Sequence, residues 1–160
     1  MKDVRPIKRH PALVNLSKDH HNRLLLCWKI RNGLAAGIST ERIGNYLLYF
    51  FEEDLKKHFH EEEKLVFPTL PTDDPLRLQA LSEHKNIYTQ VEKIRQDRHA
   101  ARLLEEFASM LDDHIRFEER ILFQHLQQVL APAQLESILH HSAERGHDCD
   151  TGWADKFWLK

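Results

Sequence analysis

The sequence predicts an all-α protein: an up-down-up-down four-helix bundle with a short extra helix and a tail at its C-terminal end. Apolar residues recur at helical spacing along most of the chain, and the alternation typical of strands is absent. Only 5 glycines and 6 prolines occur among 160 residues, which indicates few turns and long regular elements. Four long helices with short connections are typical of an antiparallel bundle.

The first half of the chain predicts two long helices. The first should run from Pro11 to about Leu34, where glycines interrupt the apolar pattern. Ser39 or Thr40 can cap the second, because both side chains accept hydrogen bonds from a helix N-terminus. The pattern then continues to about Phe67, and the prolines beyond it end the helix.

The second half repeats this arrangement. Asp74 followed by Pro75 is typical of an N-cap and a first-turn proline, so the third helix should begin there. It should end at residues 96–98, and the fourth helix should span about residues 100–130. These four helices define a predicted bundle domain over residues 1–130.

Residues 131–160 are expected to form a C-terminal helix, opened by Pro132, and an aromatic tail. The tail contains Trp153, Phe157 and Trp158, which we expect either on the bundle or at a homodimer contact. Other residues of this region form a loose set without tight ligand spacing: His140, His141, His147 and Cys149.

Composition excludes several classes of protein. The formal charge of −2 gives no electrostatic reason to expect nucleic acid or an anionic membrane as partner. Cys27 and Cys149 are the only cysteines, so neither a disulfide framework nor a zinc ribbon is indicated. The first residues lack the apolar core of a signal peptide, and no apolar run approaches the roughly 20 residues of a membrane span. A cytoplasmic protein is expected.

Two segments of the chain resemble each other. "HFHEEEKLVFPTL" from His58 and "HIRFEERILFQHL" from His114 are identical at five positions. The identical pairs are His58/His114, Glu62/Glu118, Glu63/Glu119, Phe67/Phe123 and Leu70/Leu126. A weaker similarity links "LSKDHHN" with "LSEHKN" and pairs His20 with His84. The chain therefore resembles two copies of one helical hairpin, each with one histidine on its first helix and His-x-x-x-Glu on its second.

Helical spacing places these polar residues on apolar faces. The expected neighbours of His20 are Leu13, Leu16, Leu24 and Cys27. Those of His58 and Glu62 are Leu47, Phe51, Leu55 and Leu65. Those of His84 are Ala80, Ile87 and Val91. Those of His114 and Glu118 are Leu103, Phe107, Met110 and Ile121. Each helix thus directs polar groups at the bundle axis.

Four imidazoles and two carboxylates in a core require a partner, because isolated buried carboxylates are costly. No lysine or arginine is expected on these faces near the site. Neutral imidazole and carboxylate are good ligands for Fe, Mn and Zn, and two carboxylates can bridge two cations. The sequence therefore predicts a metal site, with no separate catalytic residue assigned. Its ligands would be His20, His58, Glu62, His84, His114 and Glu118. The Glu-x-x-His order of ferritin-like di-iron proteins is reversed here, which argues against that class.

The motifs "LSKDHHNRL", "HFHEEEKLVFP", "LSEHKN" and "HIRFEERILF" together resemble the haemerythrin-like, or HHE cation-binding, family, over roughly Pro11 to Leu130. The resemblance implies a four-helix bundle with a non-haem di-iron centre that meets O₂ or related small oxidants. It implies the same six ligands, with both glutamates bridging two Fe ions alongside a bridging oxygen.

The chain departs from the oxygen-carrying haemerythrins at one ligand. They have a fifth histidine one helical turn from the His84 position, where this chain has Ala80 and Tyr88. Two six-coordinate ions need about 12 bonds, so roughly two positions stay open. This favours sensing of O₂ or oxidants, or iron handling, over a pure carrier. The alternatives are a di-iron redox enzyme that consumes peroxide, nitric oxide or O₂, and a structural bundle with zinc or no metal.

Several neighbouring residues are alternatives to these ligands. His21 competes with His20 but faces elsewhere on its helix, and His60 should be exposed. Asp54 is a candidate to fill the vacancy or orient an imidazole. Tyr88 is expected in the core, with a hydrogen bond to an iron-bound oxygen as the alternative, and His125 should lie at the end of the bundle. Three further acids flank the ligands and are expected to be mainly solvated, with hydrogen bonding to a ligand as the alternative: Glu61, Glu63 and Glu119.

Overall fold

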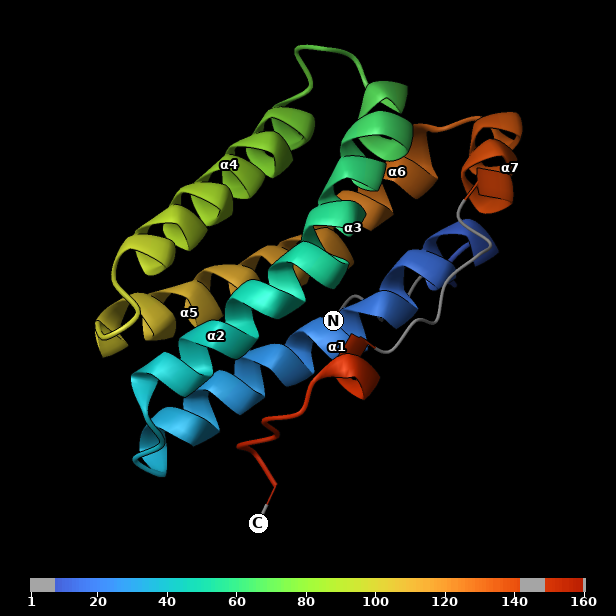
Figure 1. Cartoon of the computed structure of the whole chain (residues 1–160). Helices are drawn as coiled ribbons and strands as arrows, with labels where there is room; N and C mark the ends of the chain where they lie inside the picture. Colours follow the sequence, from blue (N-terminus) through green and yellow to red (C-terminus); the bar gives the residue numbers. More distant parts are fainter. Residues whose placement is uncertain (1–7, 142–148, 160) are drawn as a thin grey trace, which may run out of the picture.

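A computed structural model describes residues 8–141 and 149–159, and this part of the chain contains helices and no strand. The long helices lie side by side and alternate in direction along the chain, with a short helix, α7, at one end (Figure 1). The predicted fold class, an up-down-up-down bundle with an extra helix, is confirmed. None of the described helices is both long enough and apolar enough to cross a membrane.

Two of the four long helical segments consist of α-helical pieces joined by π-helical turns. The elements in the first half of the chain are α1 (Pro11–Ala35), α2 (Thr40–Phe50), the π turn η1 (Phe51–Leu55), α3 (Lys56–Glu61), the π turn η2 (Glu62–Val66) and the 3₁₀ turn η3 (Phe67–Thr69). Those in the second half are α4 (Pro75–Gln96), α5 (Ala101–Phe117), the π turn η4 (Glu118–Leu122), α6 (Phe123–Val129), α7 (Pro132–His141) and the 3₁₀ turn η5 (Cys149–Gly152).

Side-chain caps mark the starts of α1 and α4, whereas α2 begins after Ser39 without a cap hydrogen bond from that side chain. His10 precedes Pro11, and its Nδ1 accepts a hydrogen bond from the Ala12 amide at 3.1 Å. Asp74 caps α4 by accepting a hydrogen bond from the Leu76 amide at 2.9 Å. Beyond the end of α1, Gly37 has φ of +73°, a conformation that residues with a Cβ rarely adopt. These signals are local, and the predicted boundaries therefore lie close to the observed ones.

The π turns change which side chains face the core. Each π turn contains one more residue than an α-helical turn, so residues beyond it rotate relative to an uninterrupted helix. Val66 is therefore buried where Leu65 was expected, and Leu122 is buried where Ile121 was expected. Ile121 is 49% exposed. The predicted apolar faces are wrong at these two positions because they assumed a continuous α-helix.

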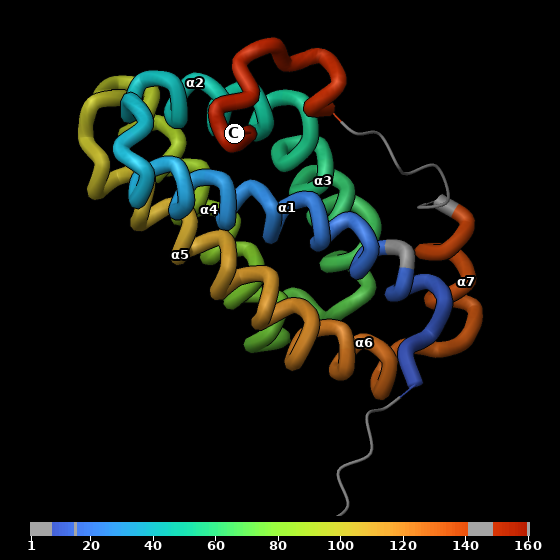
Figure 2. The backbone as a smooth tube through the Cα atoms, turned by 90° about the horizontal axis from the view of Figure 1, so that it is seen from below, coloured from blue at the N-terminus to red at the C-terminus, as the bar shows by residue number. Residues whose placement is uncertain are grey.

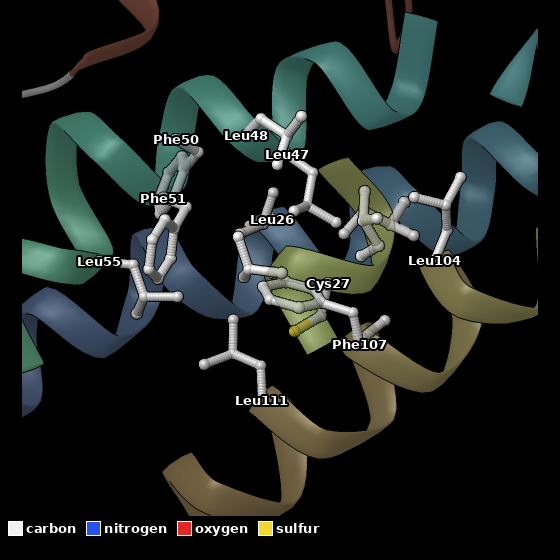
Figure 3. Packing of buried hydrophobic residues seen from close by; sticks show 14 of the residues in the cluster. Leu26, Cys27, Leu47, Leu48, Phe50, Phe51, Leu55, Leu104, Phe107 and Leu111 are labelled. Atoms are coloured by element: carbon white, nitrogen blue, oxygen red, sulfur yellow. The ribbon is translucent and has the colours of Figure 1, made fainter. Parts of the chain in front are cut away.

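Two apolar clusters form the core, one toward each end of the bundle. The larger cluster includes Leu26, Leu47 and Phe107, which lie together in Figure 3. The second cluster contains Leu16 and Phe123, together with residues of α7. The six predicted ligands lie where the two clusters meet along each helix that carries them. The apolar residues thus enclose a single polar layer.

The C-terminal region packs on the bundle at two places. Helix α7 lies near the start of α1, and its Leu135 and Ile138 are buried in the second cluster. The tail lies against α1 and α2 (Figure 2), where the Asp150 carboxylate accepts hydrogen bonds from Lys29 and Tyr46 at 2.5 and 2.6 Å. Phe157 packs into the larger cluster.

A glycine makes room for the tail. A Cβ on Gly33 would lie 2.9 Å from the Phe157 ring, closer than ordinary contact allows. The aromatic tail therefore packs on its own bundle in this structure.

Candidate metal centre

The structure brings all six predicted ligands together in the polar layer. Each of them is at most 3% exposed: His20, His58, Glu62, His84, His114 and Glu118. They come from the four long helical segments that build the bundle. Charged and polar side chains are rarely buried to this degree without a partner, so the layer calls for a specific chemical explanation.

The ligand atoms form two groups that share a carboxylate. Atoms of Glu62, His84, His114 and Glu118 lie within 4.8 Å of one another, and atoms of His20, His58 and Glu118 form a second such group. Glu118 faces both, because its Oε1 lies 2.5 Å from His114 Nε2 and its Oε2 lies 3.4 Å from His20 Nε2.

Glu62 also lies between the two groups. Its Oε1 is 3.0 Å from His58 Nε2 and 3.4 Å from His84 Nε2, and these histidines belong to different groups. Each carboxylate therefore contacts imidazoles from both groups. Two carboxylates in these positions have the arrangement needed to bridge a pair of cations.

The buried oxygens are not satisfied by protein donors. Within the described residues, neither oxygen of Glu62 nor of Glu118 has a hydrogen bond of acceptable geometry, although imidazole nitrogens lie close to them. The Nε2 atoms of His84 and His114 hydrogen-bond to each other at 3.1 Å. The unsatisfied carboxylate oxygens are costly in a protein interior. A cation that accepts lone pairs from all of them removes the cost, so the residues present fit a metal.

The carboxylates shift the pKa values of the imidazoles around them. Burial lowers the pKa of His20, but contacts with Glu118 and Glu119 outweigh it and raise the pKa to about 9. Burial acts in the same way on His84, whose contacts with Glu118, Glu62 and Glu63 raise its pKa to about 11. These values belong to the metal-free protein. A cation would bind here in place of protons, because metal ligation requires neutral imidazole.

One ligand histidine is shifted in the opposite direction. Burial and the nearby positive charge of Arg23 lower the pKa of His58 below its usual value. The Glu118 carboxyl has a pKa well below its usual range: burial raises it, but the contacts with imidazoles prevail. The metal-free layer therefore holds an ionised Glu118 beside a neutral His58.

Three further glutamates contact the outer nitrogens of the ligand imidazoles. Glu119 Oε1 lies 2.5 Å from His20 Nδ1, and Glu83 Oε1 lies 2.9 Å from His114 Nδ1. Glu63 Oε2 lies 3.3 Å from His84 Nδ1, a longer and less well aligned contact. A carboxylate on Nδ1 fixes the ring so that Nε2 points inward, as is usual for metal-binding histidines.

The repeat explains two of these contacts. Glu63 and Glu119 occupy equivalent positions in the two hairpins, and each contacts the histidine on the first helix of the other hairpin. The expectation that both are mainly solvated is wrong, and their identity in the repeat was the signal available for this role. Glu83 was missed altogether, because nothing in the spacing of α4 links it to a histidine on α5.

Residues near the start of the described chain hold the Glu119 side chain in place. The Arg9 guanidinium pairs with its carboxylate and donates to its backbone carbonyl at 2.7 Å. Ser17 Oγ donates to Glu119 Oε2 at 3.1 Å. Glu119 therefore connects two outer residues to His20.

We expect Glu119→Ala to lower metal affinity by about 10- to 100-fold, because His20 loses the group that fixes its orientation. Competition with a chelator measures the affinity. Glu63→Ala should cost less, since its contact with His84 is longer, and Glu53→Ala, on the exposed surface of η1, serves as the control. Equal affinity in all three variants would contradict an orienting role.

A buried arginine beside the site was not expected. Arg23 is 3% exposed, and its Nε lies 3.1 Å from Asp54 Oδ2. The apolar pattern placed Leu24 on this face instead, but Leu24 is 40% exposed. The residues three and four positions after His20 could both lie on its face of α1. Arg23 takes this position because it packs against η1. Asp54 lies outside both ligand groups.

The remaining candidates are placed as follows. His60 is exposed, as predicted, and His21, the alternative to His20, is exposed as well. His125 Nε2 contacts Asp74 Oδ2 at 2.8 Å at one end of the bundle, and Tyr88 Oη lies 3.5 Å from Glu63 Oε2. Of the loose C-terminal set, His147 and the side chain of His141 lie outside the described residues, while Cys149 is buried and His140 exposed.

Comparison with known proteins agrees with this geometry. The family model for the Hemerythrin HHE cation binding domain matches residues 12–126. The chain belongs to this family. Searches of curated proteins and of solved structures return no significant match. The matched range contains all six predicted ligands, so the buried His/Glu clusters of this HHE domain are suited to binding metal.

Proposed function

We propose that the chain holds a pair of Fe ions, with His20, His58, Glu62, His84, His114 and Glu118 as ligands. The observation that carries the proposal is the position of Glu118, whose two oxygens face imidazoles of different ligand groups. No cysteine belongs to either group, and this favours Fe, Mn or Zn over metals that prefer thiolate. Among these, Fe agrees with the di-iron centre that the sequence resemblance implies.

We further propose that the centre binds or senses O₂ or a related small oxidant, or handles iron. Neither neighbour of His84 one turn away is an imidazole, so two six-coordinate ions would keep roughly two positions for exogenous ligands. Iron supplies redox change and coordination of small molecules when it is bound. Of this chain's residues, Glu119 and Glu83 orient the imidazoles, and the two apolar clusters keep bulk water from the layer.

Metal content and absorption test the proposal. Protein loaded anaerobically with Fe(II) should contain about two ions per chain and develop a new ligand-to-metal band on exposure to air. A band that disappears on deoxygenation would indicate reversible binding, and irreversible conversion would favour sensing or redox handling. Turnover of peroxide that is lost in His114→Ala would favour the enzyme. Fewer than one metal per chain after growth with iron would contradict the di-iron proposal.

Adjacent histidines supply a matched pair of variants. His20→Ala should lose metal, because His20 is buried and contacts Glu118, whereas His21→Ala should keep the full complement because His21 is exposed. Metal analysis of the purified variants measures the difference. The reverse result would show that the ligand on α1 is assigned wrongly.

A further inference from the structure

A long groove, the α5 groove, follows α5 and is bounded at one end by α4 as well. It consists of two adjoining cavities of about 340 and 410 Å³, which share Met110 and Asp113. The residues of α5 that line them run from Arg102 to Phe117, which corresponds to roughly 22 Å of helix. This length matches a helical peptide of about 15 residues.

The α5 groove combines an apolar floor with an acidic rim. Ile87 and Phe117 are buried beneath it, and Met110 is half-buried where the two cavities meet. Four of the lining residues are carboxylates, and each is at least partly exposed: Glu83, Glu105, Glu106 and Asp113. Grooves of this kind bind amphipathic helices, whose apolar side chains enter the floor while their charged side chains meet the rim.

Few positive charges balance these carboxylates. Arg102 is the one lysine or arginine among the described residues that line the α5 groove, and its Nη1 lies 3.5 Å from Glu106 Oε1. Arg116, one turn beyond Asp113, pairs instead with Asp112 at 2.8 Å. The α5 groove therefore carries net negative charge, which favours a basic partner. A symmetric contact with the same groove of a second copy would bring like charges together.

Glu83 connects the α5 groove to the proposed metal centre. Its Oε1 lies 2.9 Å from His114 Nδ1, and its Oε2 accepts a hydrogen bond from Gln79 Nε2 at 2.8 Å. The Glu83 side chain is 27% exposed, so a cation in the groove can reach the carboxylate that orients a ligand imidazole. A cation there competes with His114 for this carboxylate, and the two interactions therefore oppose each other.

We propose that the α5 groove is the docking site of a basic amphipathic segment of a partner protein, and that docking is coupled to the metal centre through Glu83. Apolar side chains of the segment contact Met110, and its lysine or arginine side chains pair with Asp113 and Glu105. A basic side chain at Glu83 weakens the interaction of this carboxylate with His114, so docking lowers metal affinity. Coupling is reciprocal, so metal binding lowers the affinity for the partner by the same factor. Docking itself is independent of the metal, whereas the coupling rests on the proposed function.

A labelled amphipathic helical peptide of about 15 lysine and leucine residues tests docking on the metal-free full chain. Fluorescence anisotropy gives its dissociation constant at physiological ionic strength. The double variant Asp113→Asn, Glu105→Gln should weaken binding about 5-fold or more, since two ion pairs are lost. Met110→Ser should weaken binding without a change of charge. The control, Glu41→Gln with Glu53→Gln, removes the same charge from exposed positions of α2 and η1 and should bind the peptide as the wild type does.

Three results would overturn docking at this groove. One is equal peptide affinity in the two double variants, or an unchanged affinity in Met110→Ser, because only non-specific attraction between charges would then remain. Another is displacement of the peptide by an equal concentration of spermidine, which would show a site for free amines instead of a protein segment. The third is self-association of the wild type that is lost in the Asp113→Asn, Glu105→Gln variant, which would assign the groove to a second copy.

The same titration on protein loaded anaerobically with Fe(II) tests the coupling. Metal should weaken peptide binding by about 5-fold or more in the wild type and leave it unchanged in Glu83→Gln. Equal peptide affinity with and without metal in the wild type overturns the coupling. A wild-type chain that binds the peptide but no metal overturns the proposed function and the coupling, while docking stands. A chain that binds metal but not the peptide overturns docking alone.

Discussion

Replacing Glu118 by glutamine should abolish the dinuclear centre while the bundle still folds. The substitution keeps the shape of the side chain but removes the charge, and Glu118 is the one residue common to both ligand groups. Metal content should fall from about two ions per chain to below about one. The fold should persist because both apolar clusters are untouched.

Thermal unfolding provides a second measure of this variant. A ligand present at 100 times its dissociation constant stabilises the folded state by about 2.7 kcal/mol, which corresponds to roughly 5–10 °C for a domain of this size. Iron should therefore raise the Tm of the wild type and leave that of Glu118→Gln unchanged. Glu105→Gln, on the exposed face of α5, is the matched control and should behave as wild type. Full metal content in Glu118→Gln would show that Glu118 is not a ligand.

Phe107→Ala should produce the largest loss of stability. The Phe107 side chain is completely buried in the larger apolar cluster, where it lies next to Cys27 of α1 (Figure 3). Truncation of such a side chain costs about 3–5 kcal/mol, since both transfer energy and packing are lost. Total stabilities are commonly about 5–15 kcal/mol, so a large fraction would be removed. Urea unfolding of the metal-free protein measures the change.

The same variant separates packing from metal binding. Phe107 precedes His114 by two helical turns, roughly 10 Å along α5, so the ligands should keep their positions. Metal content should therefore be retained at temperatures where the variant is folded. Leu78→Ala, on an exposed side chain, should change stability by less than about 0.5 kcal/mol. A comparably small effect at Phe107 would contradict the packing of this cluster.

The sequence by itself determined the helices and the six polar positions. Helix boundaries depend on short-range signals, such as the Asp74 cap and the prolines after Phe67, which are legible along the chain. The polar positions were predictable for a different reason. His58 and Glu62 interrupt an apolar face, and their repetition as His114 and Glu118 showed that the interruption is systematic. Helical periodicity predicted the burial of all six.

Only the tertiary structure decided which groups support these six. Glu83 and Glu119 contact histidines on other helices, and the Glu119–His20 contact joins residues 99 positions apart. Helical periodicity relates residues within one helix and carries no information about such pairs. Arg23 was likewise missed, because its burial depends on Asp54 of another element rather than on its own polarity.

Which side chains face the core after each ligand glutamate also depended on the tertiary structure. The π turns that begin at Glu62 and Glu118 bury Val66 and Leu122 in place of the residues before them. A π turn is intrinsically less favourable than an α turn, so it persists only where the surrounding packing requires it. That packing comes from neighbouring helices, and a pattern that assumes 3.6 residues per turn cannot anticipate it.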